Sequence, residues 1–315
     1  MTRRSWGILA ILPLIGLSGC SVMGDRGPAL LPTRYQLRTG PYVVSSQFPI
    51  SAEHPVIGQL THLQGEVETT LGLGQDQITG PVEIFILDDK KDYLKFLSIH
   101  FPELPPRRAF FLARGGRRII YAFLNEHIEE DLRHEATHAL LHASVGDLPL
   151  WLDEGLAEYF EPPSQRSRLH PEHLARLKEL ASTGWEPDLP RLESLGQIDE
   201  MTPKEYSESW AWVHYLINGP AADRARLGDY LRDVQARRQP TPLSARPGEP
   251  QPQLAGELLD YLSKVEKVPA STLASGGVSV RSQSDTLKVE REPARRRSFF
   301  PWLGRIFGRD DEPAR

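Results

Sequence analysis

The apolar positions along the chain follow a strand-like pattern at first and a helix-like pattern later. Residues 42–46 and 82–87 are rich in β-branched and aromatic residues, while residues 109–113 and 118–123 flank an Arg-Gly-Gly-Arg turn that predicts a β-hairpin. Elsewhere apolar residues recur every three or four positions, which is typical of helices. This spacing predicts helices over residues 55–71, from a cap at Asp88 or Asp89 to about 99, 128–143, 149–160, 171–182, 207–217, 222–237 and 254–264.

This order of elements predicts an α+β fold, in which a small mixed β-sheet is followed by a mainly helical half. We expect the folded domain over residues 41–268, with residues 20–40 as a linker in front of it. The chain has 315 residues, of which 39% are hydrophobic and 25% charged. This composition is that of a globular protein and excludes collagen, a coiled coil and a polytopic membrane protein.

Charge and cysteine content narrow the possible partners. The formal net charge is −5, and a mildly acidic chain lacks the basic footprint of nucleic-acid-binding proteins. We therefore exclude nucleic acid as the main partner. The single cysteine, Cys20, also excludes an intramolecular disulfide.

Residues 1–19 have the pattern of a secretory signal, with basic residues, an apolar run from Trp6 to Leu17 and small residues before Cys20. The run is shorter than the about 20 apolar residues that a membrane-spanning helix needs. The sequence Leu-Ser-Gly-Cys that ends at Cys20 resembles the bacterial lipobox. The resemblance implies that Cys20 is lipidated and anchors the protein to a bacterial membrane in the cell envelope. Ser21 is similar to the sorting pattern of outer-membrane lipoproteins, which favours the outer membrane or the periplasmic face.

The C-terminal part of the chain differs in composition from the rest. Residues 269–297 are dominated by Ser, Gly, Thr, Arg and Glu, which predicts a disordered linker. In residues 298–309 aromatic and aliphatic side chains alternate with arginines, which suits a lipid headgroup layer or the groove of a partner. A tail without a role is the alternative interpretation.

The main chemical signal is the sequence His-Glu-Ala-Thr-His at residues 134–138. His134 and His138 are one helical turn apart, about 6 Å along the axis, so both imidazoles can reach one cation. Glu135 projects beside them and can act as a general base. His142 extends the same row, but it lies about 12 Å from His134 and is too far away to share the ion.

A catalytic zinc ion needs a third protein ligand and one open position. Fifteen residues separate His138 from Glu154, which is enough for a turn at Gly146-Asp147 and a second helix that returns antiparallel to the first. Glu154 would then face the two histidines. We expect one Zn²⁺ ion, held by His134, His138 and Glu154.

These residues, together with the sequence Trp-Leu-Asp-Glu-Gly-Leu-Ala-Glu-Tyr at 151–159, resemble the gluzincin zinc metallopeptidases, and most closely their bacterial peptidase-MA-like group. The resemblance covers residues 80–220 and implies a zincin-like helical subdomain around the active-site helix. It implies that Glu154 is the third ligand and that Glu158 orients a ligand histidine. It also implies that Tyr206 donates a hydrogen bond to the oxyanion; packing at a helix start is the alternative for this tyrosine.

Two features depart from the family pattern. Asp131 stands where an uncharged residue is usual, and the spacer before Glu154 is shorter than in the zinc aminopeptidases of this type. The Gly-Ala-Met-Glu-Asn type of motif, which anchors a free amino terminus in aminopeptidases, is absent from the sequence. This favours an endopeptidase.

The sequence therefore predicts a membrane-anchored zinc peptidase that acts on a peptide or protein substrate, with Glu135 and Tyr206 as catalytic residues. We expect residues 118–123 to offer a strand edge to the extended substrate. Two alternatives stay open. In one, the fold binds peptides without cleaving them; in the other, the protein is an envelope scaffold that acts through its C-terminal tail.

Overall fold

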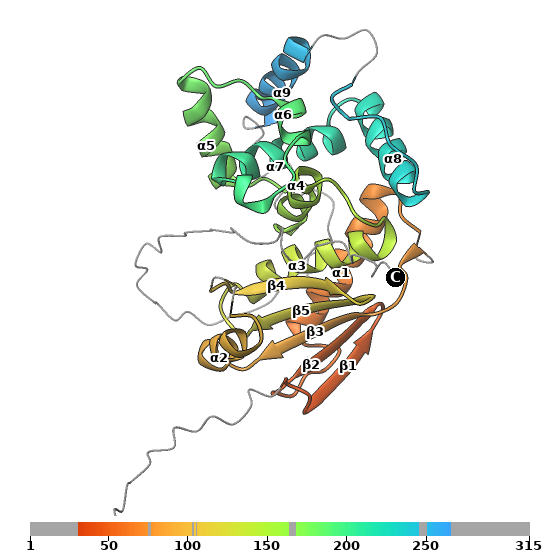
Figure 1. Cartoon of the computed structure of the whole chain (residues 1–315), viewed down its shortest axis with the longest axis vertical. Helices are drawn as coiled ribbons and strands as arrows, with labels where there is room; N and C mark the ends of the chain where they lie inside the picture. The colour runs from red at the N-terminus through yellow and green to blue at the C-terminus, as the bar shows by residue number, and fades with distance from the viewer. Residues whose placement is uncertain are drawn as a thin grey trace, which may run out of the picture.

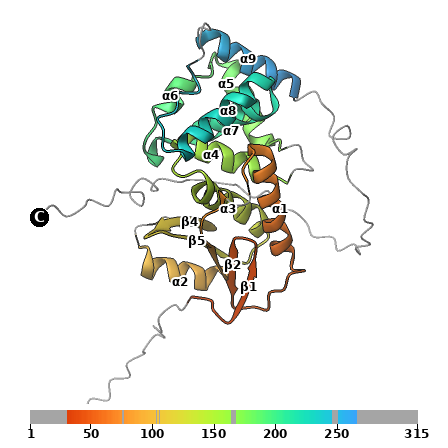
Figure 2. The same cartoon turned by 90° about the vertical axis from the view of Figure 1, so that its right-hand side faces the viewer.

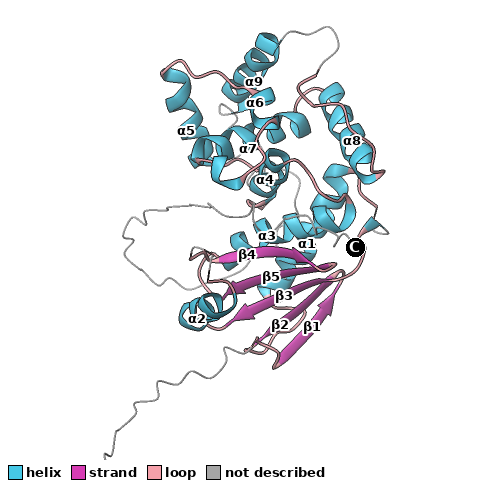
Figure 3. Cartoon of the chain, in the orientation of Figure 1, coloured by secondary structure: helices cyan, strands magenta, loops and turns pink. Residues whose placement is uncertain are grey.

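The computed structural model describes residues 31–265, apart from residues 75–76, 103, 105, 164–167 and 246–250. These residues form a five-stranded sheet and a larger set of helices, which confirms the α+β fold (Figure 3). The strands are β1 (Tyr35–Thr39), β2 (Tyr42–Ser46), β3 (Val82–Leu87), β4 (Ala109–Arg114) and β5 (Arg117–Phe123). The helices are α1 (Pro55–Leu71), α2 (Lys90–His100), α3 (Ile128–Ser144), α4 (Leu150–Phe160), α5 (Pro171–Ser182), α6 (Leu189–Glu193), α7 (Pro203–Asn218), α8 (Ala221–Gln235) and α9 (Gln251–Val265), and a 3₁₀ turn lies at Ile198–Glu200.

The sheet is mixed, with the strand order β1-β2-β3-β5-β4. The pairs β1–β2 and β4–β5 are antiparallel hairpins, while β2–β3 and β3–β5 are parallel. Because β5 lies between β3 and β4, its backbone groups are used on both sides. The prediction that this strand offers an edge to a substrate is therefore wrong, and β4 is the edge strand next to the helical half.

The two faces of the sheet bury different helices, because side chains alternate between the faces of a strand. Phe85 and Tyr121 point to the face that α2 covers, where they pack with Phe96. Ile84 and Ile120 point to the opposite face and belong to the main core with α1 and α3. Figures 1 and 2 show α2 on one side of the sheet and α1 and α3 on the other, with the remaining helices beyond α3.

The helical half is organised around the contact between α4 and α7. A Cβ atom built on Gly155 of α4 would lie 2.7 Å from the backbone oxygen of Ser209 and 2.8 Å from the side chain of Val213. Only glycine therefore allows the two helices to approach this closely. The buried Trp210 and Trp212 of α7 complete this part of the core.

Most element bounds agree with the sequence prediction, and the differences have physical causes. The predicted linker 20–40 is too long, because β1 lies within it; its side chains alternate only between half-buried and exposed, so pairing with β2 stabilises it. Helix α7 begins at Pro203, four residues earlier than predicted, because Thr202 and Glu205 form a capping box. The apolar pattern does not predict the short helix α6, which has only five residues.

Several sequence predictions lie outside the described residues. They are the signal segment 1–19, the lipidation site Cys20, the linker 269–297 and the tail 298–309. Among the residues that are described, no helix combines the length and the apolar character needed to cross a bilayer.

Candidate metal centre

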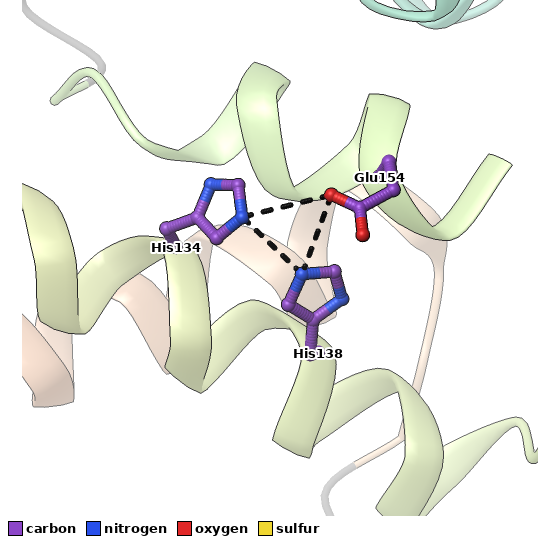
Figure 4. Close-up of side chains that lie close together, drawn as sticks. All are labelled: His134, His138 and Glu154. Atoms are coloured by element: carbon purple, nitrogen blue, oxygen red, sulfur yellow. Dashed lines mark hydrogen bonds and ion pairs between the residues drawn. The ribbon is translucent and has the colours of Figure 1, made fainter. Parts of the chain in front are cut away.

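Helix α3 carries the two histidines of the motif on its buried face. His134 and His138 are 7% and 6% exposed, and their Nε2 atoms lie 3.3 Å apart (Figure 4). Asp131, one turn before His134, forms an ion pair with Arg108 at 2.6 Å. Arg108 therefore compensates the charge of Asp131.

The third candidate ligand comes from α4, as the sequence predicts. Helix α3 ends at Ser144, and Gly146, with φ of +107°, lies where the chain turns back into α4. There the 2% exposed Glu154 points at both histidines, with its Oε2 atom 3.8 Å from Nε2 of His134 and 3.9 Å from Nε2 of His138 (Figure 4).

The ligand atoms of His134, His138 and Glu154 form a triangle, called the ligand triangle below, whose size fits a zinc ion. Tetrahedral zinc with bonds of about 2 Å separates its ligand atoms by about 3.3 Å. The two nitrogens already have this spacing, and the carboxylate oxygen needs to move by only about half an ångström. Two imidazoles and one carboxylate are also the donor types of catalytic zinc sites.

Two carboxylates set the orientation of the histidine rings. Nδ1 of His138 lies 2.9 Å from Oδ2 of Asp153, and Nδ1 of His134 lies 3.2 Å from Oε2 of Glu161. An ionised carboxylate only accepts hydrogen bonds, so each Nδ1 carries the proton. In the neutral rings both Nε2 lone pairs then point toward Glu154, which is the arrangement that a metal ion requires.

The predicted role of Glu158 therefore differs from what the structure shows. Its Oε2 atom lies 3.0 Å from Nε2 of His173, and Glu161 is the carboxylate that contacts the candidate ligand His134. Glu161 was not singled out in the sequence. Its position seven residues after Glu154, two turns along the same face of α4, is the signal that marks it.

The charges of the cluster strongly affect its protonation. Burial opposes the charged form of His134, but the hydrogen bond with Glu161 and the charges of Glu135 and Glu158 outweigh it and raise its pKa to about 10. Burial opposes the charged form of His138 too, yet Asp153 and Glu154 raise its pKa to about 9. A cation that binds here therefore displaces protons.

Glu135 lies between the ligand triangle and the edge of the sheet. The backbone N–H of Phe111 in β4 donates a hydrogen bond to Oε2 of Glu135 at 2.7 Å, and the glutamate is only 7% exposed. This contact fixes the carboxylate next to His134. It also places Glu135 beside the edge strand β4.

Two further polar side chains are electrostatically linked to the cluster. Burial raises the pKa of Tyr206 well above its usual value, and the charges of Glu154 and Glu158 add to the effect, so the phenol stays protonated. Burial lowers the pKa of Arg107, against the opposing charges of Glu135 and Glu154. Arg107 precedes the edge strand and was missed in the sequence, where no periodicity or motif marks it.

His142 lies outside the cluster, as its distance along α3 predicts. Its Nδ1 atom accepts a hydrogen bond from Arg118 at 3.1 Å, and its Nε2 atom faces the exposed Asp147.

The part of the chain that carries these residues matches a known sequence family. Residues 130–242, from the first turn of α3 to beyond α8, match the model described as "Protein of unknown function (DUF1570)". A comparison with curated proteins found no match. The match includes the ligand triangle and Tyr206, but not the edge strand β4.

Proposed function

We propose that the protein is a zinc-dependent peptidase, tethered to a bacterial envelope membrane through Cys20, that cleaves internal bonds of peptides or proteins. The observation that carries this proposal is the convergence of His134, His138 and Glu154, with both histidine tautomers set by carboxylates. A site that only held a metal would not need Glu135, whose carboxylate is fixed beside the triangle by a backbone hydrogen bond.

His134, His138 and Glu154 would hold the zinc ion. When bound, zinc supplies an electrophile that acidifies water and polarises a peptide carbonyl. Glu135 accepts the proton of the attacking water and transfers it to the amine that leaves. Tyr206 stays protonated, so its phenol can donate a hydrogen bond to the oxyanion. The edge strand β4 would hold the substrate in an extended conformation.

Zinc content and hydrolysis test the proposal together. We expect zinc in the full-length wild-type chain and less of it in Glu154→Ala, as measured by elemental analysis. Peptides blocked at both ends should be cleaved by the wild type, whereas Glu135→Gln should keep its zinc and lose about 10²–10⁴-fold in rate, the usual contribution of a general base. Glu129→Gln, in the first turn of the same helix, is the matched control.

The outcome also decides between the alternatives. Equal cleavage by wild type and Glu135→Gln would contradict the peptidase. Zinc without cleavage of any peptide would favour a module that binds peptides. Deletion of residues 270–315 should leave the hydrolysis of soluble peptides unchanged, whereas a scaffold that acts through its C-terminal tail would lose its function.

A further inference from the structure

A second group of histidines and carboxylates lies next to the ligand triangle, between α4 and α5. Oε2 of Glu158 is 3.0 Å from Nε2 of His173 and 3.7 Å from Nε2 of His170. The ligand atoms of these three residues lie within 4.8 Å of one another, and none of the side chains is more than 13% exposed. The group repeats the donor set of the first cluster, two imidazoles and one carboxylate.

The tautomer of His173 is set by a hydroxyl group. The Ser207 Oγ atom donates its only proton to the backbone oxygen of Pro203 at 2.8 Å, so it accepts from Nδ1 of His173 at 2.9 Å and from Arg176 at 3.0 Å. Nδ1 of His173 therefore carries a proton. In the neutral ring the Nε2 lone pair then faces the carboxylate of Glu158, a repulsive contact unless a positive charge lies there.

Two carboxylates lie here among the imidazoles of His134, His170 and His173. Carboxylate oxygens of Glu158 and Glu161 lie within 4.8 Å of each other, and Oε1 of Glu161 is 3.7 Å from Nε2 of His170. Buried carboxylates need compensating charge. One divalent cation would balance the charge of both carboxylates.

We propose that Glu158, His170 and His173 form a second divalent-cation site, which suits zinc because of its nitrogen donors. Glu161 links the two sites, since one of its oxygens contacts His134 and the other faces His170. The second site is independent of the proposed peptidase activity, because none of its three ligands belongs to the first triangle.

Replacement of His170 tests the site with little risk to the fold. His170 is the N-cap of α5 and makes no capping hydrogen bond with its side chain, while asparagine is among the best N-cap residues. His170→Asn thus removes a ligand and favours the helix. The control is His54→Asn at the N-cap of α1, where asparagine can also accept the hydrogen bond that the Val56 N–H donates to His54. Glu158→Gln is a second variant of nearly unchanged shape.

The readout is zinc per full-length chain after dialysis against zinc, with circular dichroism to check the fold. We expect two ions in the wild type and in His54→Asn, and one in each of His170→Asn, Glu158→Gln and Glu154→Ala. One ion in the wild type that both second-site variants retain would overturn the second site. Two ions that both variants retain would also overturn it.

The zinc contents of the same variants distinguish the second cation site from the proposed peptidase site. One wild-type ion that is lost only in Glu154→Ala leaves the peptidase site standing and removes the second site. One ion that is lost in His170→Asn and kept in Glu154→Ala does the reverse. A wild type without zinc overturns both sites, and imidazolium protons then compensate the carboxylates.

Discussion

Two histidine–glutamate clusters use one face of α4: the first is His134, His138 and Glu154, and the second is Glu158, His170 and His173. The histidines of the two clusters are held in place differently. In the first, carboxylates contact both Nδ1 atoms, from Asp153 to His138 and from Glu161 to His134. In the second, Nδ1 of His173 contacts the neutral hydroxyl of Ser207. A carboxylate partner raises the basicity of a ligand histidine more than a hydroxyl does. The first cluster is therefore expected to bind zinc more tightly than the second.

The clusters also differ in how their helices are positioned. The first is built from α3 and α4, and α4 packs directly on α7 through Gly155. The second depends on α5, which follows a longer connection. One face of α4 therefore contributes to both clusters, the first completed by the adjacent helix α3 and the second by the more distant α5.

The largest expected effect acts on both clusters and comes from Arg133. This side chain is 1% exposed, donates hydrogen bonds to the backbone oxygens of Phe160 and Glu161 at the end of α4, and pairs with Glu66 at 2.6 Å. Arg133→Met leaves several buried carbonyls without a partner and leaves Glu66 with Arg168 as its remaining arginine partner. The unfolding free energy should fall by about 3–5 kcal/mol.

Thermal unfolding measures this change, and the midpoint should drop by about 6–20 °C for a domain of this size. The control is Arg238→Met, which removes an arginine that is 63% exposed and should change stability by no more than about 0.5 kcal/mol. Equal midpoints for the two variants would show that Arg133 does not hold the end of α4.

A smaller effect is expected where α4 meets α7. Gly155→Ala places a methyl group against the backbone of Ser209, and overpacking of this kind costs about 1–3 kcal/mol. Because Glu154 is the adjacent residue, the zinc affinity of the first cluster should fall more than that of the second. Denaturant unfolding and zinc titration measure the two quantities.

Gly58→Ala in α1 is the control for this substitution. A Cβ atom at Gly58 would have no neighbour within 4 Å, so alanine should stabilise this helix by up to about 1 kcal/mol. Stabilisation by Gly155→Ala as well would contradict the close contact of α4 with α7.

A substitution at Asp153 tests whether the two clusters bind zinc separately. Asp153→Asn removes the charged partner of His138 and should weaken zinc binding at the first cluster by about 10–100-fold, with the second cluster unchanged. Asp147→Asn is the control, because this carboxylate faces His142 instead of a ligand. Zinc titrations of the three proteins make the comparison, and equal losses at both clusters would contradict separate sites.

The smallest effect is expected at Ser207. Ser207→Ala removes a neutral hydrogen bond to His173, worth about 1 kcal/mol, so zinc affinity at the second cluster should fall by about fivefold. The measurement uses the Glu154→Ala background, in which the second cluster is read alone. A loss as large as that of Asp153→Asn would show that the two kinds of partner hold their histidines equally well.

Local patterns predicted much of the fold. The bounds of α1 and β3 match the prediction, because a helix with regular apolar spacing or a short buried strand is marked by its own residues. The strand β1 has weak alternation and depends on its pairing with β2. The order of β4 and β5 in the sheet was also beyond local pattern, since a hairpin can join a sheet by either strand.

Some residues of the candidate site are also marked by local sequence pattern, and others only by the packing of the helices. The motif residues His134, Glu135 and His138 are marked by helical spacing, and Glu154 by its place in the next helix. Glu161, the actual partner of His134, shows its role only once α4 is packed on α3. The same holds for His170 and His173, which lie far from the motif in sequence.

By itself, the sequence determined the helices, the core strands and the one-turn spacing of the two motif histidines, because these depend on interactions between residues close in the chain. Only the tertiary structure decided which strand is the edge, which carboxylate meets which histidine, and that a second group of histidines and a carboxylate converges on α4. Those contacts join residues far apart in the sequence, and the packing of the core positions them.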